Sequence, residues 1–214
     1  GFFAACAPDA TPSDILKSYG DGWLIHQVSF KPWPACRHAH ATIDAALEIY
    51  GQGLAQSDIE SIVVTTYPDA LKFCDKPTPT STIEAKFSLQ HSVAVVLSKG
   101  RPELADFDAG AISDLAFAAL RERVSVQAGE PFVSAYPARY GASVEVLGRN
   151  GRIGFAEVPD ALGDPENPLE PEQIDAKAYM LLEHAGVSKD NAQKVVELAA
   201  APTPALLSLL CELL

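Results

Sequence analysis

The segment from Lys31 to Pro34 constrains the fold more strongly than any other part of this 214-residue chain. Its two prolines lack the backbone N–H that a helix interior and a central β-strand both require. One regular element must therefore end before the segment, and another must begin after it. The apolar, β-branched residues 23–30 predict a strand on the N-terminal side, and the apolar spacing within 36–50 predicts a helix on the other side.

The junction between these two elements has the character of an anion-binding site. Lys31 stands at the end of the predicted strand and faces the start of the predicted helix. The first turns of that helix carry Cys36, Arg37, His38 and His40. The unpaired N–H groups and the dipole of a helix N-terminus attract anions, and cationic side chains nearby strengthen the attraction. The junction therefore favours a small carboxylated ligand.

The charge balance of the chain argues against several other partners. Its 28 acidic and 16 basic residues give a formal net charge of -12, whereas binding to nucleic acid requires clustered lysine and arginine. The sequence has no apolar run long enough to span a bilayer, and residues 1–22 lack the charged and apolar regions expected of a signal peptide. The four cysteines are scattered without a C-x-x-C pair, which favours reduced thiols over a zinc site. We therefore predict a cytoplasmic protein that binds neither nucleic acid nor membranes.

The rest of the pattern predicts an α+β body with a mixed, mostly antiparallel sheet and helices packed on it. Further strands are expected at 59–67, 124–127, 138–147 and 152–158. Helices are expected at 81–99, where a capping box begins the run, and at 112–123, with a proline- and threonine-rich loop at 75–80.

Helical patterns flank this body on both sides. They cover residues 11–19, 171–185, 188–199 and 204–214. A mixed domain between helical segments suggests an insertion within an all-α domain. The chain begins with Gly1 rather than methionine, so we expect it to be part of a longer polypeptide.

Three blocks of residues, in order along the chain, resemble the signature of the MmgE/PrpD family. They are 31–40 with 43–47, 85–94, and 163–169. The family includes 2-methylcitrate dehydratases, cis-aconitate decarboxylases and iminodisuccinate epimerases. The resemblance implies a lyase or isomerase that needs no cofactor and removes a proton next to a carboxylate of a small di- or tricarboxylate. Dehydration, decarboxylation or epimerisation would follow.

The resemblance also implies how the chain is divided. Residues 1–22 would end a large helical domain, 23–160 would form an α+β lid over the active site, and 161–214 would return to the helical domain. The bulk of that domain carries several catalytic histidines and a lysine in relatives, and it would precede Gly1. We therefore expect this helical domain, or a partner chain, to complete the site, and we expect a homodimer, as is common in the family.

The resemblance places a substrate-facing lysine of the lid at Lys31. Its ammonium would bind a carboxylate and take part in proton transfer, although a lysine at a strand end can also face solvent. Cys36 stands where some decarboxylases of the family carry a histidine, and it would be a substrate contact with a stabilised thiolate or an inert thiol. Arg37 would bind a carboxylate or pair with Asp44 or Glu48 on its own helix.

His40 is the second candidate for catalysis. Asp44 lies one turn further along the helix and could fix the imidazole tautomer, for acid–base chemistry or only to steady the helix. His91 occupies a position at which relatives often present a tyrosine to the cleft, although a histidine on an apolar face is commonly a core residue. Lys86 would face the ligand or the solvent. No third ligand is evident beside His38 and His40, so no metal site is predicted.

A second class of function stays open at this point. Without the catalytic helical domain, the chain could be a non-catalytic remnant that binds a carboxylate or serves in dimerisation. The apolar residues 205–214 would then need cover from a partner, because an exposed run of this kind is poorly soluble.

Overall fold

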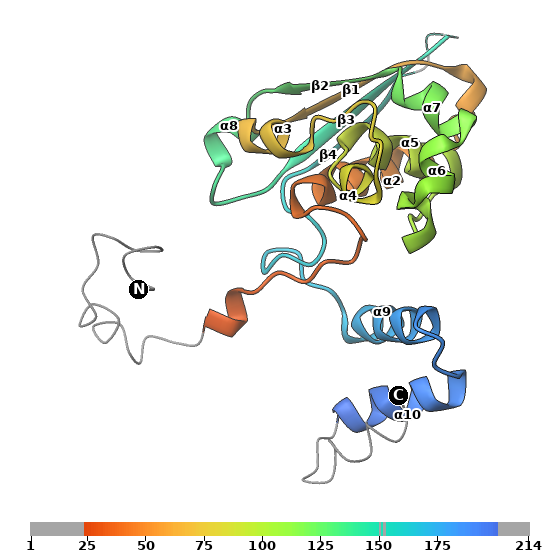
Figure 1. The fold of residues 1–214 in the computed structure, drawn as a ribbon. Coiled ribbons are helices and arrows are strands. Elements are labelled where there is room, and N and C mark those ends of the chain that lie inside the picture. The colour runs from red at the N-terminus through yellow and green to blue at the C-terminus, as the bar shows by residue number, and fades with distance from the viewer. Residues whose placement is uncertain (1–23, 150, 152, 201–214) are drawn as a thin grey trace, which may run out of the picture.

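The computed structural model describes residues 24–149, 151 and 153–200 (Figure 1). A four-stranded sheet with the strand order β2-β1-β3-β4 forms the centre of the body. Its strands are β1 (Ile59–Thr66), β2 (Val124–Ala128), β3 (Ala142–Gly148) and β4 (Ile153–Val158). β1 pairs in parallel with β2, and the other two pairings are antiparallel. The prediction of an α+β fold with a mixed, mostly antiparallel sheet is confirmed.

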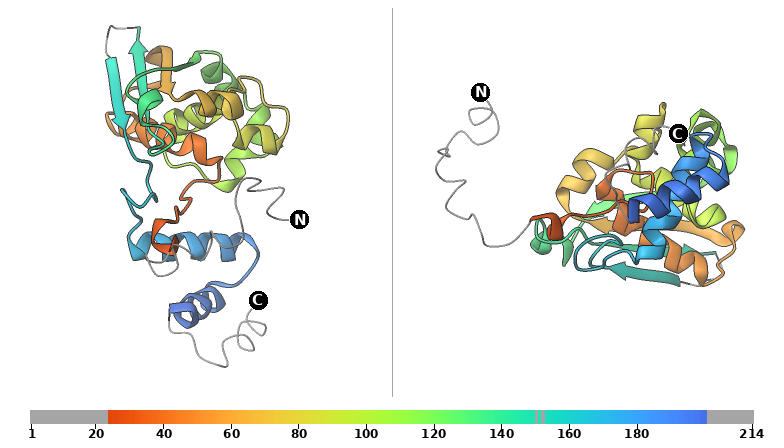
Figure 2. Two further views of the ribbon diagram at one scale, coloured as in Figure 1. Left: turned by 90° about the vertical axis from the view of Figure 1, so that its left-hand side faces the viewer. Right: turned by 90° about the horizontal axis from the view of Figure 1, so that it is seen from below.

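Helices cover one face of this sheet, as the view from below in Figure 2 shows. α2 (His40–Gly51) and α5 (Leu89–Lys99) contact each other on that face, and α2 also contacts β3 and β4. Along β1, Ile62 and Val64 are fully buried beneath the helices, whereas Val63 lies on the opposite, less covered face. The alternation follows from the two-residue period of a strand. The core therefore lies between one helical layer and one side of the sheet.

The long helix predicted behind Ser81 is two helices. α4 (Thr82–Lys86) begins at the predicted cap, where the Ser81 hydroxyl accepts a hydrogen bond from the Glu84 amide at 3.3 Å. Ser88 then caps α5, because its hydroxyl accepts from the His91 amide at 2.9 Å. A serine at such a position satisfies an unpaired amide of the first turn. The second capping serine therefore restarts the helix in a new direction.

The next predicted helix is likewise divided, at Asp114. α6 (Ala109–Ser113) precedes this residue, and α7 (Leu115–Arg121) follows it, with the Asp114 carboxylate accepting from two amides of the first turn. Two short helices are additional to the prediction. They are α3 (Pro68–Cys74), which has a proline at its start, and α8 (Phe132–Ala135).

The strand predicted at 23–30 is not formed in the part that the structure describes. Leu24–Gln27 is a 3-10 helix (η2), and the residues after it join no strand of the sheet. Phe30 donates a backbone hydrogen bond to the Gly163 carbonyl at 2.8 Å, but the apolar side chains of the segment are largely exposed. Strands are stabilised by packing against cross-strand neighbours, and β-branched composition alone does not supply them. Lys31 therefore follows an extended segment and not a strand end.

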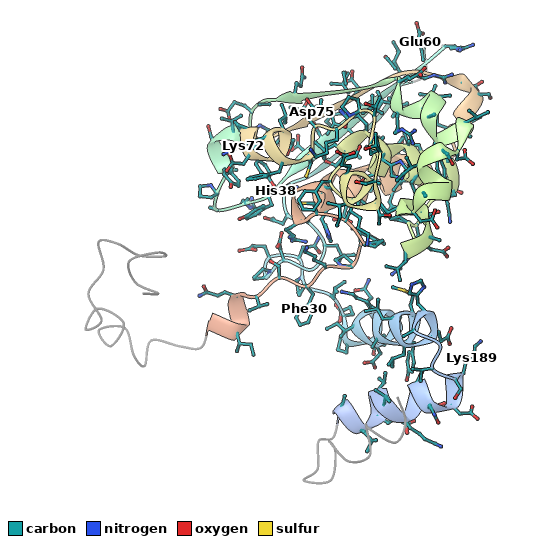
Figure 3. All side chains as sticks on the ribbon, in the orientation of Figure 1. Phe30, His38, Glu60, Lys72, Asp75 and Lys189 are labelled. Carbon is teal, nitrogen blue, oxygen red and sulfur yellow. The ribbon has the colours of Figure 1, made fainter. Side chains whose placement is uncertain are left out.

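After the body, the chain forms two further helices, as predicted. α9 (Pro171–His184) and α10 (Lys189–Ala200) contact each other and lie below the body in Figure 1. Phe30 lies between the body and α9 (Figure 3). The helices predicted at 11–19 and 204–214 fall outside the described residues. Within the described part of the chain, no helix combines the length and the apolar character needed to cross a membrane.

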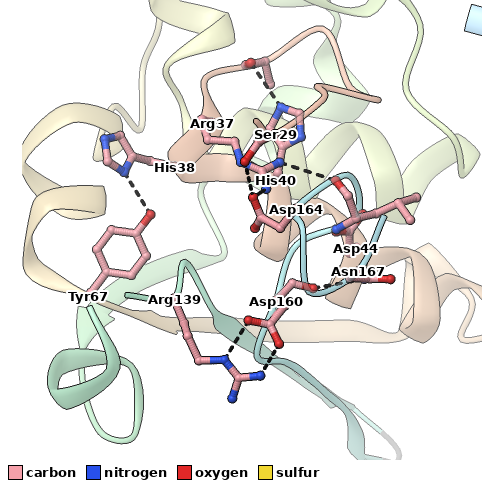
Figure 4. A network of polar contacts seen from close by, with 12 residues as sticks. Ser29, Arg37, His38, His40, Asp44, Tyr67, Arg139, Asp160, Asp164 and Asn167 are labelled. Atoms are coloured by element: carbon pink, nitrogen blue, oxygen red, sulfur yellow. Dashed lines mark hydrogen bonds and ion pairs between the residues drawn. The ribbon is translucent and has the colours of Figure 1, made fainter. Parts of the chain in front are cut away.

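Two segments that are distant in sequence are bound together at the base of the body (Figure 4). The Ser29 hydroxyl donates to the Asp164 carboxylate at 2.6 Å, and the same carboxylate pairs with Arg37. Gly163 has a φ of 90°, and a Cβ at this position would lie 2.2 Å from the Phe30 carbonyl oxygen. Only glycine fits there. We call these five residues the clasp, since they join the incoming and outgoing connections of the body.

Candidate functional site

A cavity of about 330 Å³ lies between the body and α9. Its lining consists of the segment 31–36, of Lys86 and Phe87 at the end of α4, of Leu104, and of Lys177, Met180 and Leu181 on α9. The cavity is thus built where the proline-rich junction, a short helix and the first helix beyond the body meet.

The structure divides the six predicted site residues into two groups. Lys31, Cys36 and Lys86 line the cavity together. Arg37, His40 and His91 are not among its lining residues, and each has its contacts elsewhere in the fold.

Three lysines give the cavity its positive charge. Lys31, Lys86 and Lys177 come from three separate segments, and the lining contains no acidic residue. The Lys177 ammonium donates to the Lys31 carbonyl at 2.5 Å, which ties α9 to the junction. Ammonium groups make short, charge-assisted hydrogen bonds to carboxylates. In a chain of net charge -12, this arrangement suits a ligand with more than one carboxylate.

The wall formed by the junction is held in place by Trp33. This side chain is 5% exposed, and its indole N–H donates to the Asp44 carboxylate at 2.7 Å. The other oxygen of that carboxylate accepts from the Leu162 amide at 2.7 Å. Burial raises the pKa of Asp44, and both hydrogen bonds oppose the shift. The Cys36 amide also donates to the Lys86 carbonyl at 2.8 Å, so the junction and α4 form one continuous wall.

Cys36 is strongly acidified at its place in the cavity wall. A hydrogen bond from the Cys74 thiol lowers the pKa of Cys36 to about 6. Burial opposes this shift, while the His38 and Arg37 amides and the Lys31 ammonium add to it. Cationic groups and free amides stabilise a thiolate over a thiol. This environment favours the thiolate form of Cys36.

Arg37 points into the clasp and away from the cavity. Its guanidinium pairs with Asp164 and donates to the Leu162 carbonyl at 3.4 Å. The alternative pairing with Asp44 is not formed, because that carboxylate is already occupied by Trp33 and Leu162. The position of Arg37 therefore does not support its predicted role in substrate binding. Its observed contacts join the residues just before α2 to the segment that leaves the body.

His40 is fully buried at the start of α2. Its Nε2 lies 3.3 Å from the Ala35 carbonyl, and its Nδ1 has no hydrogen-bond partner among the described residues. Burial lowers the pKa of His40 to about 3, and the nearby Arg37 charge acts in the same direction. The predicted contact with Asp44 is not formed. The imidazole is neutral and supports the cavity wall at Ala35 without reaching the cavity.

His91 lies in the core, between α5, α7 and the 3-10 helix η5 (Leu104–Phe107). Its Nε2–H donates to the Asp106 carbonyl at 2.7 Å, and its Nδ1 accepts from the Arg121 guanidinium at 3.0 Å. Because arginine can only donate, these contacts fix a neutral tautomer. Burial lowers the pKa of His91 as well. In this structure His91 serves the core, and its expected place in the cleft is not observed.

His38 belongs to an aromatic cluster. Its Nδ1 lies 2.8 Å from the Tyr67 hydroxyl, as Figure 4 shows, and its ring stacks on Phe73 with the centroids 5.3 Å apart. Tyr67 in turn stacks on Tyr136 at 4.3 Å. Across the described residues, no group of three or more histidines, cysteines or acidic residues is arranged to hold a metal ion.

Lys177 is the candidate site residue that the sequence did not reveal. It lies 146 residues beyond Lys31 and is therefore outside every local pattern that marks the junction. Met180 and Leu181 follow it by three and four positions, a spacing that places all three side chains on one face of α9. This spacing signals a covered helix face, but the partner of that face appears only in the structure.

These features define a class of domain, in which an α+β body is followed by a pair of helices and a cavity with three lysines lies between the body and the first of these helices. Residues 33–201 match the family described as the MmgE/PrpD C-terminal domain. The chain therefore belongs to the MmgE/PrpD family, and the resemblance noted in the sequence is confirmed.

Curated relatives match part of the chain at low identity. A 2-methylcitrate dehydratase of Salmonella typhimurium is 29% identical over 126 residues, which cover 56% of this chain and 26% of the relative. The 2-methylcitrate dehydratase of Escherichia coli is 28% identical over 126 residues, with the same coverage of 56% and 26%. That of Cupriavidus necator is 32% identical over 120 residues, covering 53% and 25%. The chain thus spans about a quarter of the length of these relatives.

Proposed function

We propose that the cavity binds a small di- or tricarboxylate in an enzyme of the lyase or isomerase type. The main support is the convergence of Lys31, Lys86 and Lys177 on one cavity without an acidic neighbour in its lining. Their ammonium groups supply the strong contacts that carboxylates accept. The relatives are 2-methylcitrate dehydratases, and this favours a substrate of the 2-methylcitrate kind.

In this proposal, the reaction begins with the removal of a proton next to a bound carboxylate. An ammonium group against that carboxylate lowers the cost of the negative charge that develops as the proton leaves. Lys31 fills this role and takes part in proton transfer, and the Cys36 thiolate beside it is a second group that can accept a proton. Loss of water or carbon dioxide, or return of the proton to the other face, completes the reaction.

His40 contributes to this proposed site by positioning. Its buried imidazole faces the carbonyl of Ala35 at 3.3 Å, and Ala35 lies in the cavity wall between Lys31 and Cys36. Replacing such a buried ring would shift the wall and weaken binding without removing a group that contacts the ligand.

The rest of the active site is proposed to come from outside this chain. The relatives are roughly four times as long as the region they share with it. A helical domain joined to this chain, or a partner chain, would close the cavity and supply further catalytic groups. Assembly as a homodimer in the cytoplasm is part of the same proposal.

Replacement of Lys31 by alanine tests the assignment of the cavity. The dissociation constant for 2-methylcitrate or citrate, measured by isothermal titration calorimetry on the whole protein, should rise about tenfold or more. A hydrogen bond to a charged group contributes roughly 1.5–3 kcal/mol, which corresponds to this change.

Lys189→Ala is the matched control, since it removes the same charge from an exposed position on α10, outside the cavity lining (Figure 3). Its affinity should equal that of the wild type. If Lys31→Ala binds every polycarboxylate tested as tightly as the wild type does, the cavity is not the carboxylate site.

Binding without catalysis is the second candidate function. It is favoured by the positions of His40 and His91, because neither imidazole lines the cavity. A turnover assay on the whole protein distinguishes the two. Consumption of a bound polycarboxylate would establish the enzyme, and tight binding without consumption of any would establish the binding protein.

A further inference from the structure

Two cysteines from separate elements meet at the wall of the cavity. Cys36 lies in the lining, is partly exposed, and directly precedes the 3-10 turn η3 (Arg37–Ala39). Cys74 is the last residue of α3 and is fully buried. The elements η3 and α3 contact each other, and the His38 ring of η3 stacks on Phe73, the neighbour of Cys74, with the centroids 5.3 Å apart. Cys74 belongs to the hydrophobic core cluster against which Cys36 packs, and both cysteines are free. The carboxylate-binding function proposed above gives no role to this contact.

The two sulfur atoms have opposite chemical characters. The Cys74 thiol, the neighbouring amides and Lys31 all lower the pKa of Cys36, so this sulfur, which lines the cavity, is the more readily ionised of the two. The hydrogen bond to Cys36 and burial together raise the pKa of Cys74, so this cysteine keeps its proton. In thiol–disulfide exchange the thiolate attacks, and a neighbouring thiol then displaces the first adduct. The pair therefore has one accessible attacking sulfur and one protected sulfur behind it.

The cavity also determines which oxidants reach Cys36. Cys36 lines the same cavity as Lys31, Lys86 and Lys177, so a molecule that reaches the sulfur through this cavity passes three basic residues. A small disulfide that carries carboxylates, such as oxidised glutathione, matches this charge, whereas a cationic disulfide such as cystamine does not.

We propose that Cys36 and Cys74 form a reversible redox site that reacts with acidic low-molecular-weight disulfides of the glutathione type. The Cys36 thiolate attacks one sulfur of oxidised glutathione, forms a mixed disulfide and releases a glutathione thiolate. Cys74 passes its proton to that thiolate and attacks the Cys36 sulfur, which releases the second glutathione as a thiolate. The two cysteines lose two electrons in total, and one oxidised glutathione becomes two reduced ones.

The second step is favoured by the first. Once Cys36 is part of a mixed disulfide, it no longer accepts a hydrogen bond as a thiolate. The largest cause of the raised pKa of Cys74 is then removed, so that cysteine becomes easier to ionise just when it must attack. The positions agree with this order, because Cys36 lines the cavity and Cys74 is fully buried behind it.

The test uses the whole protein with Cys6→Ser and Cys211→Ser, so that only two of the four cysteines of this chain are left. After incubation with oxidised glutathione, a thiol titration should show the loss of both thiols. A non-reducing peptide map should show the peptides of Cys36 and Cys74 linked, and dithiothreitol should restore both thiols. At equal concentration, the rate of reaction with cystamine should be at most about one tenth of the rate with oxidised glutathione.

Two variants in the same background assign the roles. In Cys74→Ser the serine hydroxyl can still donate to Cys36, so Cys36 should stay reactive and stop as a stable glutathione adduct with the loss of one thiol. In Cys36→Ser the buried Cys74 should react at least about tenfold more slowly.

Several results would overturn the proposal. A Cys36 that stays reduced would exclude it, as would a stable glutathione adduct on Cys36 while Cys74 is present. Faster reaction with cystamine would exclude the role of the basic cavity. The protein with Cys6→Ser and Cys211→Ser decides these points even if a further variant fails to fold, and none of them depends on whether the cavity binds a substrate.

Discussion

Two regions of this molecule, the cavity and the core around His91, both contain cationic side chains. They differ in whether the protein itself supplies hydrogen-bond acceptors for these cations. The lysines of the cavity face a space whose lining has no acidic residue. In the core, Arg121 donates to His91 and to the Ile112 carbonyl at 2.9 Å, and His91 donates to the Asp106 carbonyl. A buried cation whose donors are used serves the fold, whereas cations that gather around a cavity without a protein anion indicate a ligand. Residue type alone does not separate the two.

The largest expected effect is a loss of folding stability in acid, caused by the buried His40 beneath the cavity wall. The pKa of His40 is about 3 in the folded state, against an ordinary value of 6.5, so between these pH values only the unfolded chain binds the proton. Stability is therefore lost as the pH falls below 6.5, at about 1.4 kcal/mol per pH unit from this group. Relative to His40→Gln, the wild type should lose about 3–4 kcal/mol more between pH 7 and pH 4, measured by urea unfolding. Parallel pH profiles of the two proteins would contradict the buried, neutral state of His40.

Replacement of His91 by alanine should break the core and spare the cavity. Arg121 would lose an acceptor inside the protein, and we expect a loss of about 2–3 kcal/mol in the free energy of unfolding. The control is the same replacement in an Arg121→Leu background, where the loss should be smaller because no guanidinium is left unpaired. Equal losses in both backgrounds would show that the pairing is not the cause. Carboxylate affinity measured by calorimetry should be unchanged.

Replacement of Asp164 by asparagine should loosen the clasp. Arg37 and Ser29 would lose the charged acceptor that they share, and we expect a loss of about 1.5–2 kcal/mol in thermal unfolding. Asp160→Asn is the matched control, because Asp160, whose side chain is 11% exposed, pairs with Arg139, whose side chain is 49% exposed, whereas both partners of the Arg37–Asp164 pair are largely buried. Since one partner of the Asp160 pair is open to solvent, we expect a loss of only about 1 kcal/mol. If the two variants are equally stable, the clasp contributes no more to the stability of the fold than the Arg139–Asp160 pair does.

The smallest expected effect on stability comes from Lys177→Ala, which should nevertheless weaken binding. We expect the affinity for a tricarboxylate to fall about tenfold, a change of about 1.4 kcal/mol. The stability should change by less than about 0.5 kcal/mol, since the side chain is only partly buried on α9. Lys177→Arg should restore most of the affinity. A variant that binds as tightly as the wild type would show that α9 contributes shape and no charge to the cavity.

Much of the fold could be predicted from the sequence because its signals are local. Asn150-Gly151 lies between two alternating apolar runs, and the runs form the expected antiparallel pair β3 and β4. The predicted strand at 23–30 failed because its composition imitates a strand while its nearest backbone partner is Gly163, which is distant in sequence. The division of the helix behind Ser81 depends on Ser88, which the continuous apolar run conceals.

The candidate site could be predicted only in part, for a related reason. Lys31 and Cys36 belong to one short motif, so their proximity can be predicted, whereas the sequence leaves Lys86 open between the ligand and the solvent. The orientation of a residue on a helix with two covered sides is not readable, and His40 and His91 both turn out to face the core. Lys177 reaches the cavity through tertiary structure alone.

The clasp has a mechanical consequence for whatever this domain is joined to. Because the Phe30 amide donates a hydrogen bond to the Gly163 carbonyl, the chain enters and leaves the body at the same place. A pull on the incoming and outgoing segments would therefore reach this hydrogen bond and the Arg37–Asp164 ion pair before it reaches the strands. The Lys177 contact to the Lys31 carbonyl lies one residue further along the chain, so the wall of the cavity is anchored beside the same point.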